Sequence, residues 1–101
     1  MAAASAFVAV SSGLYRLEAP LTFASVAGLR DQGLKMIDSA PEGLTLDLQA
    51  VPTVDSAGLA LLIDWLGEAR SRSRRLKYVQ PPNALLSLAR LSEVERLIAE
   101  G

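Results

Sequence analysis

The residues best suited to chemistry are an acid and a hydroxyl, Asp55 and Ser56, within the stretch "TVDSAGLALLIDWL" from Thr53 to Leu66. They lie where a short apolar segment ends and a helical pattern begins. The first turn of a helix leaves backbone N–H groups unpaired and carries partial positive charge, so a side-chain oxygen of either residue can accept those protons. Asp55 comes first and is the better candidate for this cap, which leaves the Ser56 hydroxyl free and facing outward.

The chain lacks the side chains that most enzymes and metal sites use. It has no histidine and no cysteine, which excludes disulfides, thiol nucleophiles, histidine catalysis and nearly every zinc site. Its eleven acids show no spacing typical of a metal site or of paired catalytic carboxylates. Gly58 and Gly67 form no phosphate-binding loop. We therefore expect no enzymatic activity, no cofactor and no metal.

Length and composition predict one domain with one core. The chain has 101 residues, and half of them are hydrophobic. A net charge of -1 gives no general attraction to nucleic acid or anionic lipid. The longest apolar run, Leu59 to Ile63, is far shorter than the ~20 residues of a membrane span. The apolar start "MAAASAFVAV" has no Lys or Arg ahead of it, so we interpret it as part of an edge strand, not a signal peptide, and expect a cytoplasmic protein.

Turn residues divide the chain into alternating strands and helices. The segments typical of strands are Phe7 to Val10, Leu14 to Leu17, Leu44 to Leu48 and Leu76 to Val79. Helical patterns run from a Thr22 cap to about Asp38, from the Asp-Ser pair to about Arg70, and from Pro82 or Asn83 through Leu91. The final "EVERLIAE" is compatible with a short helix or a last strand. This order predicts an α/β fold, a single domain with a mixed sheet of four to five strands and helices packed on it.

Two of the helices have a predicted buried face. In the first, the expected stripe is Phe23, Val26, Leu34 and Ile37. In the second, a projection at ~100° per residue gives a core stripe of Leu59, Leu62, Ile63 and Leu66. The same projection turns Leu61 outward beside Asp64 and Glu68, with Trp65 on its flank.

The start of this second helix has the composition of a docking surface. Ala57, Gly58 and Ala60 leave its first turn nearly free of bulk, which allows close backbone approach beside an outward leucine and a large aromatic anchor. The alternative for Trp65 is packing against a neighbouring helix.

A basic run, "RSRSRR" from Arg70 to Arg75, is the sharpest charge cluster. Basic residues at a helix C-terminus are stabilised by its dipole, and this is its simplest interpretation. An acidic patch on a partner, or nearby lipid headgroups, is the alternative. Nucleic acid is the least favoured ligand, because no aromatic residues accompany the arginines.

The motif Asp55-Ser56-Ala57-Gly58-Leu59 resembles the Asp-Ser-x-Gly-Leu motif of STAS domains, the family of anti-sigma factor antagonists. The resemblance covers most of the chain: "LTLDL" before the motif, the helix after it, "RRLKYV", and the late "PPNALLSLARLSEVERLI". Within the family, "VDSAGLALL" is most similar to MlaB-type domains, the small STAS subunits of ABC phospholipid-transport systems.

The resemblance implies a STAS-like fold and a non-catalytic protein-binding module. MlaB-like members dock on the ATP-binding subunit (MlaF-like) of an ABC transporter that contains a membrane permease and serves outer-membrane lipid asymmetry. Such a subunit would be peripheral to the inner membrane through its complex. The resemblance and the helix projection together place partner binding at Asp55, Ser56, Ala57, Leu61 and Trp65.

The competing hypothesis is an anti-sigma factor antagonist that changes partner when a serine kinase phosphorylates Ser56. A phosphate would add roughly -1.5 to -2 charges, which a helix start tolerates but an apolar interface does not. Two departures from the family pattern point in opposite directions. Thr22 stands where the antagonists carry an acid, whereas Ser56 stands where MlaB-like domains carry Thr.

Overall fold

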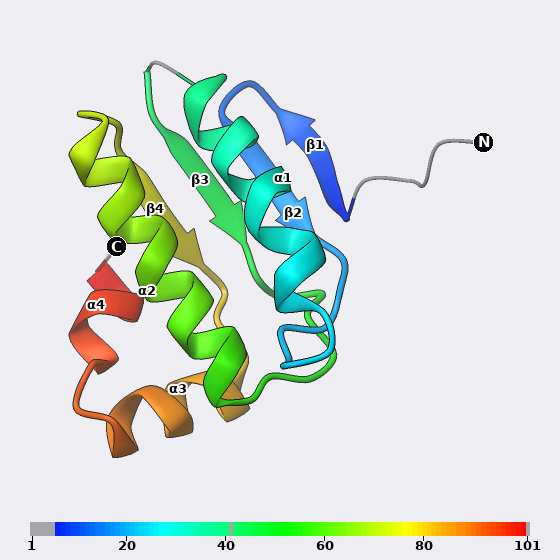
Figure 1. Cartoon of the computed structure of the whole chain (residues 1–101), viewed down its shortest axis with the longest axis vertical. Coiled ribbons are helices and arrows are strands. Elements are labelled where there is room, and N and C mark those ends of the chain that lie inside the picture. The colour runs from blue at the N-terminus through cyan, green and yellow to red at the C-terminus, as the bar shows by residue number, and fades with distance from the viewer. Residues whose placement is uncertain (1–5, 41, 101) are drawn as a thin grey trace.

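The sheet contains four strands in the order β1-β2-β3-β4, namely β1 (Phe7–Ser11), β2 (Leu14–Leu17), β3 (Leu44–Asp47) and β4 (Leu76–Val79). They are seen in a computed structural model that describes residues 6–40 and 42–100 (Figure 1). The hairpin β1–β2 is antiparallel, and β2–β3 and β3–β4 are parallel. The predicted mixed sheet is confirmed, with no fifth strand in the described part of the chain.

Four helices follow from the same sequence: α1 (Val26–Asp38), α2 (Ser56–Ser71), α3 (Asn83–Leu91) and α4 (Glu95–Glu100). Helices α1 and α2 lie side by side across one face of the sheet (Figure 1). Helix α4 packs against both β4 and α2. The tail that was compatible with a helix or a strand is therefore helical. Its Ile98 is completely buried, which joins this short helix to the core.

The core lies between the sheet and the two long helices. Strand β3 shows the predicted alternation, because Leu44, Leu46 and Leu48 are buried while Thr45 and Asp47 are only half-buried. The fully buried Tyr78 of β4 donates a hydrogen bond from its hydroxyl to the Leu62 carbonyl, at 2.5 Å. Burial, reinforced by the charge of Asp64, raises the pKa of this phenol well above its ordinary value. The bond fixes α2 on the sheet with every polar atom of this side chain satisfied.

Helix α1 begins later than the sequence predicts. Its first residue is Val26, and Thr22 does not cap it. Residues 22–25 form a turn in which Ser25 Oγ accepts from the Thr22 N–H at 3.0 Å and donates to the Pro20 carbonyl at 2.6 Å. Phe23 belongs to this turn and is 82% exposed, so the prediction that it lies in the buried stripe is wrong. The physical reason is that the turn is held by neighbouring segments, including a bridge between Leu21 and Val54, and not by helical periodicity.

Candidate functional site

Asp55 caps α2 and does more than the sequence predicts. Its Oδ1 accepts hydrogen bonds from the N–H groups of Ala57 at 2.9 Å and Gly58 at 3.1 Å. Its Oδ2 accepts from the Phe23 N–H at 2.9 Å. These donors, with the Phe23 N–H the largest contribution, lower the pKa of the carboxyl below its ordinary value despite partial desolvation. One carboxylate thus closes the first turn of α2 and attaches the turn before α1 to it.

Ser56 is the first residue of α2, and its side chain is exposed. Its hydroxyl makes no hydrogen bond to the residues that the structure describes, and the cap does not use it. The geometry agrees with the expected division of labour, in which Asp55 is the cap and Ser56 is spare. A group attached to this hydroxyl would project from the helix start without displacing a structural contact.

Gly58 is needed for packing inside this chain. A Cβ built at Gly58 would overlap the Leu21 carbonyl oxygen. The residue is buried, because the first turn of α2 lies directly on the segment that carries Leu21. Of the three small residues expected to allow close approach by a partner, Ala60 is exposed, Ala57 is half-buried and Gly58 is buried. The small size at position 58 therefore reflects an internal contact.

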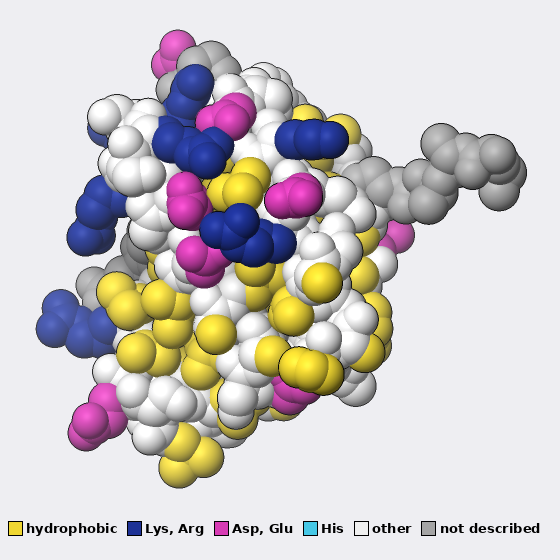
Figure 2. Space-filling model, viewed as in Figure 1, with side chains coloured by type: hydrophobic (Ala, Val, Ile, Leu, Met, Phe, Trp, Pro, Cys, Tyr) yellow, Lys and Arg dark blue, Asp and Glu magenta, His cyan; other side chains and the backbone are white. Residues whose placement is uncertain are grey.

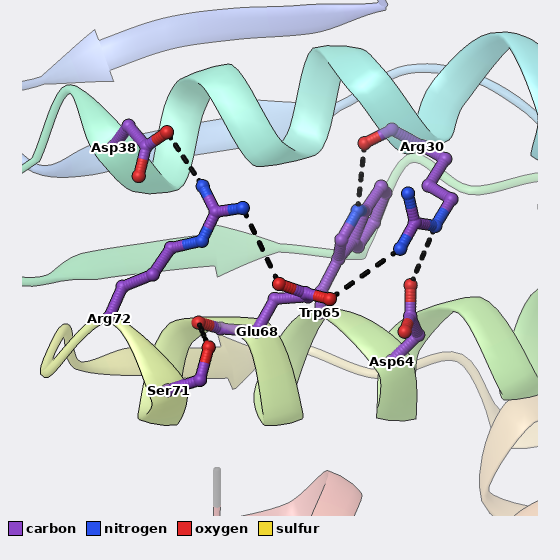
Figure 3. Close-up of polar contacts among 7 residues, drawn as sticks. All are labelled: Arg30, Asp38, Asp64, Trp65, Glu68, Ser71 and Arg72. Carbon is purple, nitrogen blue, oxygen red and sulfur yellow. Dashed lines mark hydrogen bonds and ion pairs between the residues drawn. The ribbon is translucent and has the colours of Figure 1, made fainter.

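The prediction that Leu61 and Trp65 point outward is wrong. Leu61 is 6% exposed and Trp65 is 1% exposed. The Trp65 indole faces α1, donates from Nε1 to the Arg30 carbonyl at 3.2 Å (Figure 3), and lies where a Cβ on Gly33 would overlap it. Its ring also meets Phe7 edge to face, with 5.7 Å between centroids. The alternative, packing against a neighbouring helix, is confirmed for Trp65.

The error has a simple cause, which is that α2 is buried on two sides. Leu59 and Leu62 are buried as predicted, whereas Ile63 and Leu66 are only half-buried. The projection allowed for one apolar neighbour, the sheet, but α1 is a second. The residues that the projection placed on the outward side of α2 lie on the side that α1 covers.

Ion pairs join α1 and α2 along their length (Figure 3). Arg30 Nε lies 2.9 Å from Asp64 Oδ2, and its Nη2 lies 3.6 Å from Glu68. Arg72 lies 3.4 Å from Glu68 and 2.6 Å from Asp38. The hydrogen bond that Arg72 donates to Asp38 is the main reason that the pKa of Arg72 is raised. Such exposed pairs contribute about 0–1 kcal/mol each, so their main effect is to fix the register of the two helices.

The exposed apolar surface lies at the N-terminal ends of these helices. A shallow groove of about 290 Å³ between them is lined mainly by small apolar side chains, with Arg30 and Asp64 at one end. Phe23 stands beside the α2 cap, since its N–H is bonded to Asp55. Figure 2 shows apolar side chains gathered over this lower half of the face, with the charged side chains above them. We call Phe23, Val26, Ala27, Ala57 and Ala60 the apolar docking surface.

Phe23 is the residue that sequence reasoning missed. A phenylalanine three residues before the observed start of a helix looks like the first member of an amphipathic stripe. The signal that could have separated the two cases is Pro20 with Ser25, which together favour a turn at this place. Leu61, expected as an outward anchor, instead lines the groove with its few exposed atoms.

The described ranges, 6–40 and 42–100, contain neither a candidate metal site nor a candidate membrane-spanning helix. No group of three or more acids there is arranged to hold a metal ion. None of the helices described has the length and apolar character that crossing a bilayer requires.

A four-stranded mixed sheet with a carboxylate-capped Asp-Ser-x-Gly-Leu helix start defines the class of STAS domains. The family profile described as "Mlab, STAS domain" matches residues 9–99. The chain therefore belongs to this family, the MlaB-type STAS domains. No curated protein matches the chain.

Solved structures agree on the fold. A Thermotoga maritima protein described as a candidate anti-sigma factor antagonist superposes with a TM-score of 0.74 at 14% identity, over 92% of this chain and 81% of that one. The anti-sigma factor antagonist SpoIIAA in its unphosphorylated form gives 0.69 at 17% identity, over 91% and 83%. The Bacillus cell fate determinant SpoIIAA in its phosphorylated form gives 0.65 at 17% identity, over 91% and 86%. At these identities the likeness shows the fold alone.

Proposed function

We propose that the chain is a non-catalytic accessory subunit that binds the ATP-binding subunit of an ABC phospholipid transporter in the cytoplasm. Membership of the MlaB-type family supports this partner class. The docking would use the apolar docking surface, with Ser56 at its border. In this proposal the chain reaches the inner membrane only through the complex that it joins.

The observation that carries the proposal is the exposure of Phe23. A large aromatic side chain that is 82% exposed leaves its apolar surface in water unless a partner covers it. Aromatic anchors contribute strongly to binding free energy at protein interfaces. The Phe23 backbone is bonded to Asp55 at the start of α2, and the first turns of α1 and α2 line a groove of about 290 Å³ with small side chains, which lets a partner helix or loop approach closely. The Phe23 backbone is held by Asp55, so the anchor is already positioned before binding.

A second candidate function is favoured by Ser56. Its hydroxyl is exposed at a helix start, where a phosphate would find the partial positive charge of α2. SpoIIAA, one of the structural neighbours, is described in both phosphorylated and unphosphorylated forms. This supports the alternative of an anti-sigma factor antagonist that a serine kinase switches by modifying Ser56.

Reconstitution with purified partners separates these functions. We expect the chain to co-elute with the ABC ATPase subunit and to change its rate of ATP hydrolysis, while the chain alone hydrolyses none. Ser56→Glu should keep the thermal stability of the wild type and weaken this binding, because it places an unpaired charge at the border of an apolar interface. Ser56→Ala is the matched control and should bind normally. Co-elution with a serine kinase and an absence of binding to the ATPase would favour the alternative.

A further inference from the structure

The C-terminal end of α2 carries a second surface that the proposed docking does not use. A hollow of about 520 Å³ lies between this end of α2, the start of β4, and α4. Its rim carries Arg70, Arg74, Arg75 and Lys77, and its apolar wall includes Leu66 and Leu97. We call it the basic hollow.

The four cations of the rim form no ion pair. None of them lies within ion-pair distance of a carboxylate in the described ranges, 6–40 and 42–100, although Arg75 and Lys77 also line a neighbouring hollow with Glu42. Arg72, from the same run, points the other way and pairs with Asp38 and Glu68. The basic run therefore divides into one arginine that holds α1 to α2 and a group of unneutralised charges around a hollow. Like charges gathered in this way repel one another, and a bound anion would relieve that repulsion.

The end of α2 is built to hold this group in place. Ser73 adopts a left-handed conformation, with φ 56°, and the Arg74 N–H donates to the Ala69 carbonyl at 2.8 Å. This is the hydrogen-bond pattern of a Schellman helix end, which turns the chain sharply without a glycine. The turn delivers Arg74 and Arg75 directly to the start of β4.

Strand β4 offers backbone groups at the same place. It is the last strand of the sheet, so one of its edges is unpaired in the part of the chain that the structure describes. The carbonyls of Arg75 and Val79 accept from β3, at 2.8 Å from Leu44 N and 2.9 Å from Leu48 N. Because backbone polar groups alternate in direction along a strand, the N–H and carbonyl of Leu76 point away from the sheet. Leu76 itself lines the basic hollow.

The surface is elongated. A second hollow of about 170 Å³ continues along α2 and shares Leu66, Arg70 and Leu97 with the first. Gly67 lines this second hollow, and a Cβ built at Gly67 would have no neighbouring atom within 4 Å. An extended chain segment fits two adjoining hollows beside a free strand edge better than a compact anion does.

We propose that the basic hollow binds an extended acidic segment of a partner protein, in which acidic and apolar residues alternate. The segment pairs with Leu76 along the edge of β4. Its carboxylates meet Arg74, Arg75 and Lys77, and its apolar side chains lie against Leu66 and Leu97. Main-chain pairing supplies affinity in this mode of recognition, and alternate side chains supply specificity.

A membrane surface suits the hollow less well. The large exposed apolar side chains in the described part of the chain are Val10, Phe23, Leu91 and Leu97, and of these only Leu97 borders the hollow. A bilayer would therefore find almost nothing apolar to bury beside the four cations.

The test uses a synthetic peptide of alternating Glu and Leu, blocked at both ends, added to the purified chain. The amide signals of Leu76 and Tyr78 should shift most in an NMR titration, and binding should weaken as salt is raised. Arg74→Gln combined with Lys77→Gln should weaken binding about tenfold or more. The control combines Arg16→Gln with Lys35→Gln, which changes net charge equally away from the hollow and should leave binding unchanged.

Three results would overturn the proposal. One is equal affinity for a peptide of alternating Gln and Leu, which would remove the role of charge. Another is shifts centred on the apolar docking surface. The third is co-sedimentation with phosphatidylglycerol vesicles, lost in the Arg74/Lys77 variant, without binding of the Glu-Leu peptide, which would make the ligand a membrane. Thermal melts of both double variants show whether each is folded.

Discussion

The two ends of α2 carry different surfaces, apolar at the N-terminal end and basic at the C-terminal end (Figure 2). At the N-terminal end, the Asp55 carboxylate is bonded to backbone N–H groups and the exposed surface is apolar. At the C-terminal end, Arg72 is paired, whereas Arg70, Arg74, Arg75 and Lys77 form no ion pair with the residues that the structure describes. Apolar contacts depend on shape and are disrupted by an added charge, whereas a basic rim depends on charge and is weakened by salt. One helix can therefore present two binding surfaces that respond to different changes.

The largest expected effect separates buried from exposed aromatic residues near the N-terminal end. Trp65→Ala should lower the free energy of unfolding by about 3–5 kcal/mol, because it opens a cavity between α1 and α2 and removes the bond to Arg30. Phe23→Ala should change it by less than about 0.5 kcal/mol, since Phe23 is exposed. Urea denaturation of both variants makes the comparison. Similar losses for the two would mean that Phe23 is packed against this chain and is not a free anchor.

Two glycines of α2 give the next contrast. Gly58→Ala forces a Cβ against the Leu21 backbone, and overpacking of this kind costs about 1–3 kcal/mol. Gly67→Ala meets open space in a helix interior and should raise stability by about 0.5–1 kcal/mol. Thermal melts should therefore move in opposite directions. A stable Gly58→Ala variant would show that α2 does not lie tightly on the Leu21 segment.

A smaller effect tests the cap. Asp55→Ala should lower the melting temperature, because it removes the acceptor of three backbone hydrogen bonds. Folding lowers the pKa of Asp55, chiefly through the hydrogen bond from the Phe23 N–H, so its contribution to stability is fully present above the unfolded pKa and is lost as pH falls through the folded pKa. The difference between wild type and Asp55→Ala should accordingly shrink in strong acid. Ser56→Ala should have the melting temperature of the wild type. A lower melting temperature for Ser56→Ala than for Asp55→Ala would show that Ser56, and not Asp55, is the cap.

What the sequence predicted well depended on local patterns. The alternation from Leu44 to Leu48 and the acid before α2 each act within a few residues, so one strand and one cap could be read directly. The C-terminal ends of the first three helices could also be predicted closely, because turn residues follow them. The family resemblance combined a short motif with segments along most of the chain, and the family profile matches residues 9–99.

What the sequence did not predict depended on distant contacts. Trp65 is buried because Gly33 of α1 leaves room for its indole, and the period of α2 contains no information about α1. Phe23 lies in a turn outside α1, and the N–H of this turn residue is held by Asp55, far along the chain. The basic run divides because Arg72 finds Asp38 on another helix. In each case a contact with a residue distant in the sequence, and not the local hydrophobic pattern, decides which way a side chain faces.

The central claim is that the apolar docking surface, anchored by Phe23, binds the ABC ATPase subunit. Phe23 and Leu91 are 82% and 83% exposed, but only Phe23 stands beside the capped start of α2. Phe23→Asp and Leu91→Asp therefore introduce the same charge at equally exposed sites. Both variants should have the melting temperature of the wild type. Measured by titration calorimetry against the purified ATPase subunit, Phe23→Asp should weaken binding by about 2 kcal/mol or more, as expected for an interface anchor, while Leu91→Asp should bind as the wild type does. Wild-type affinity in Phe23→Asp, or an equal loss in both variants, would contradict the account.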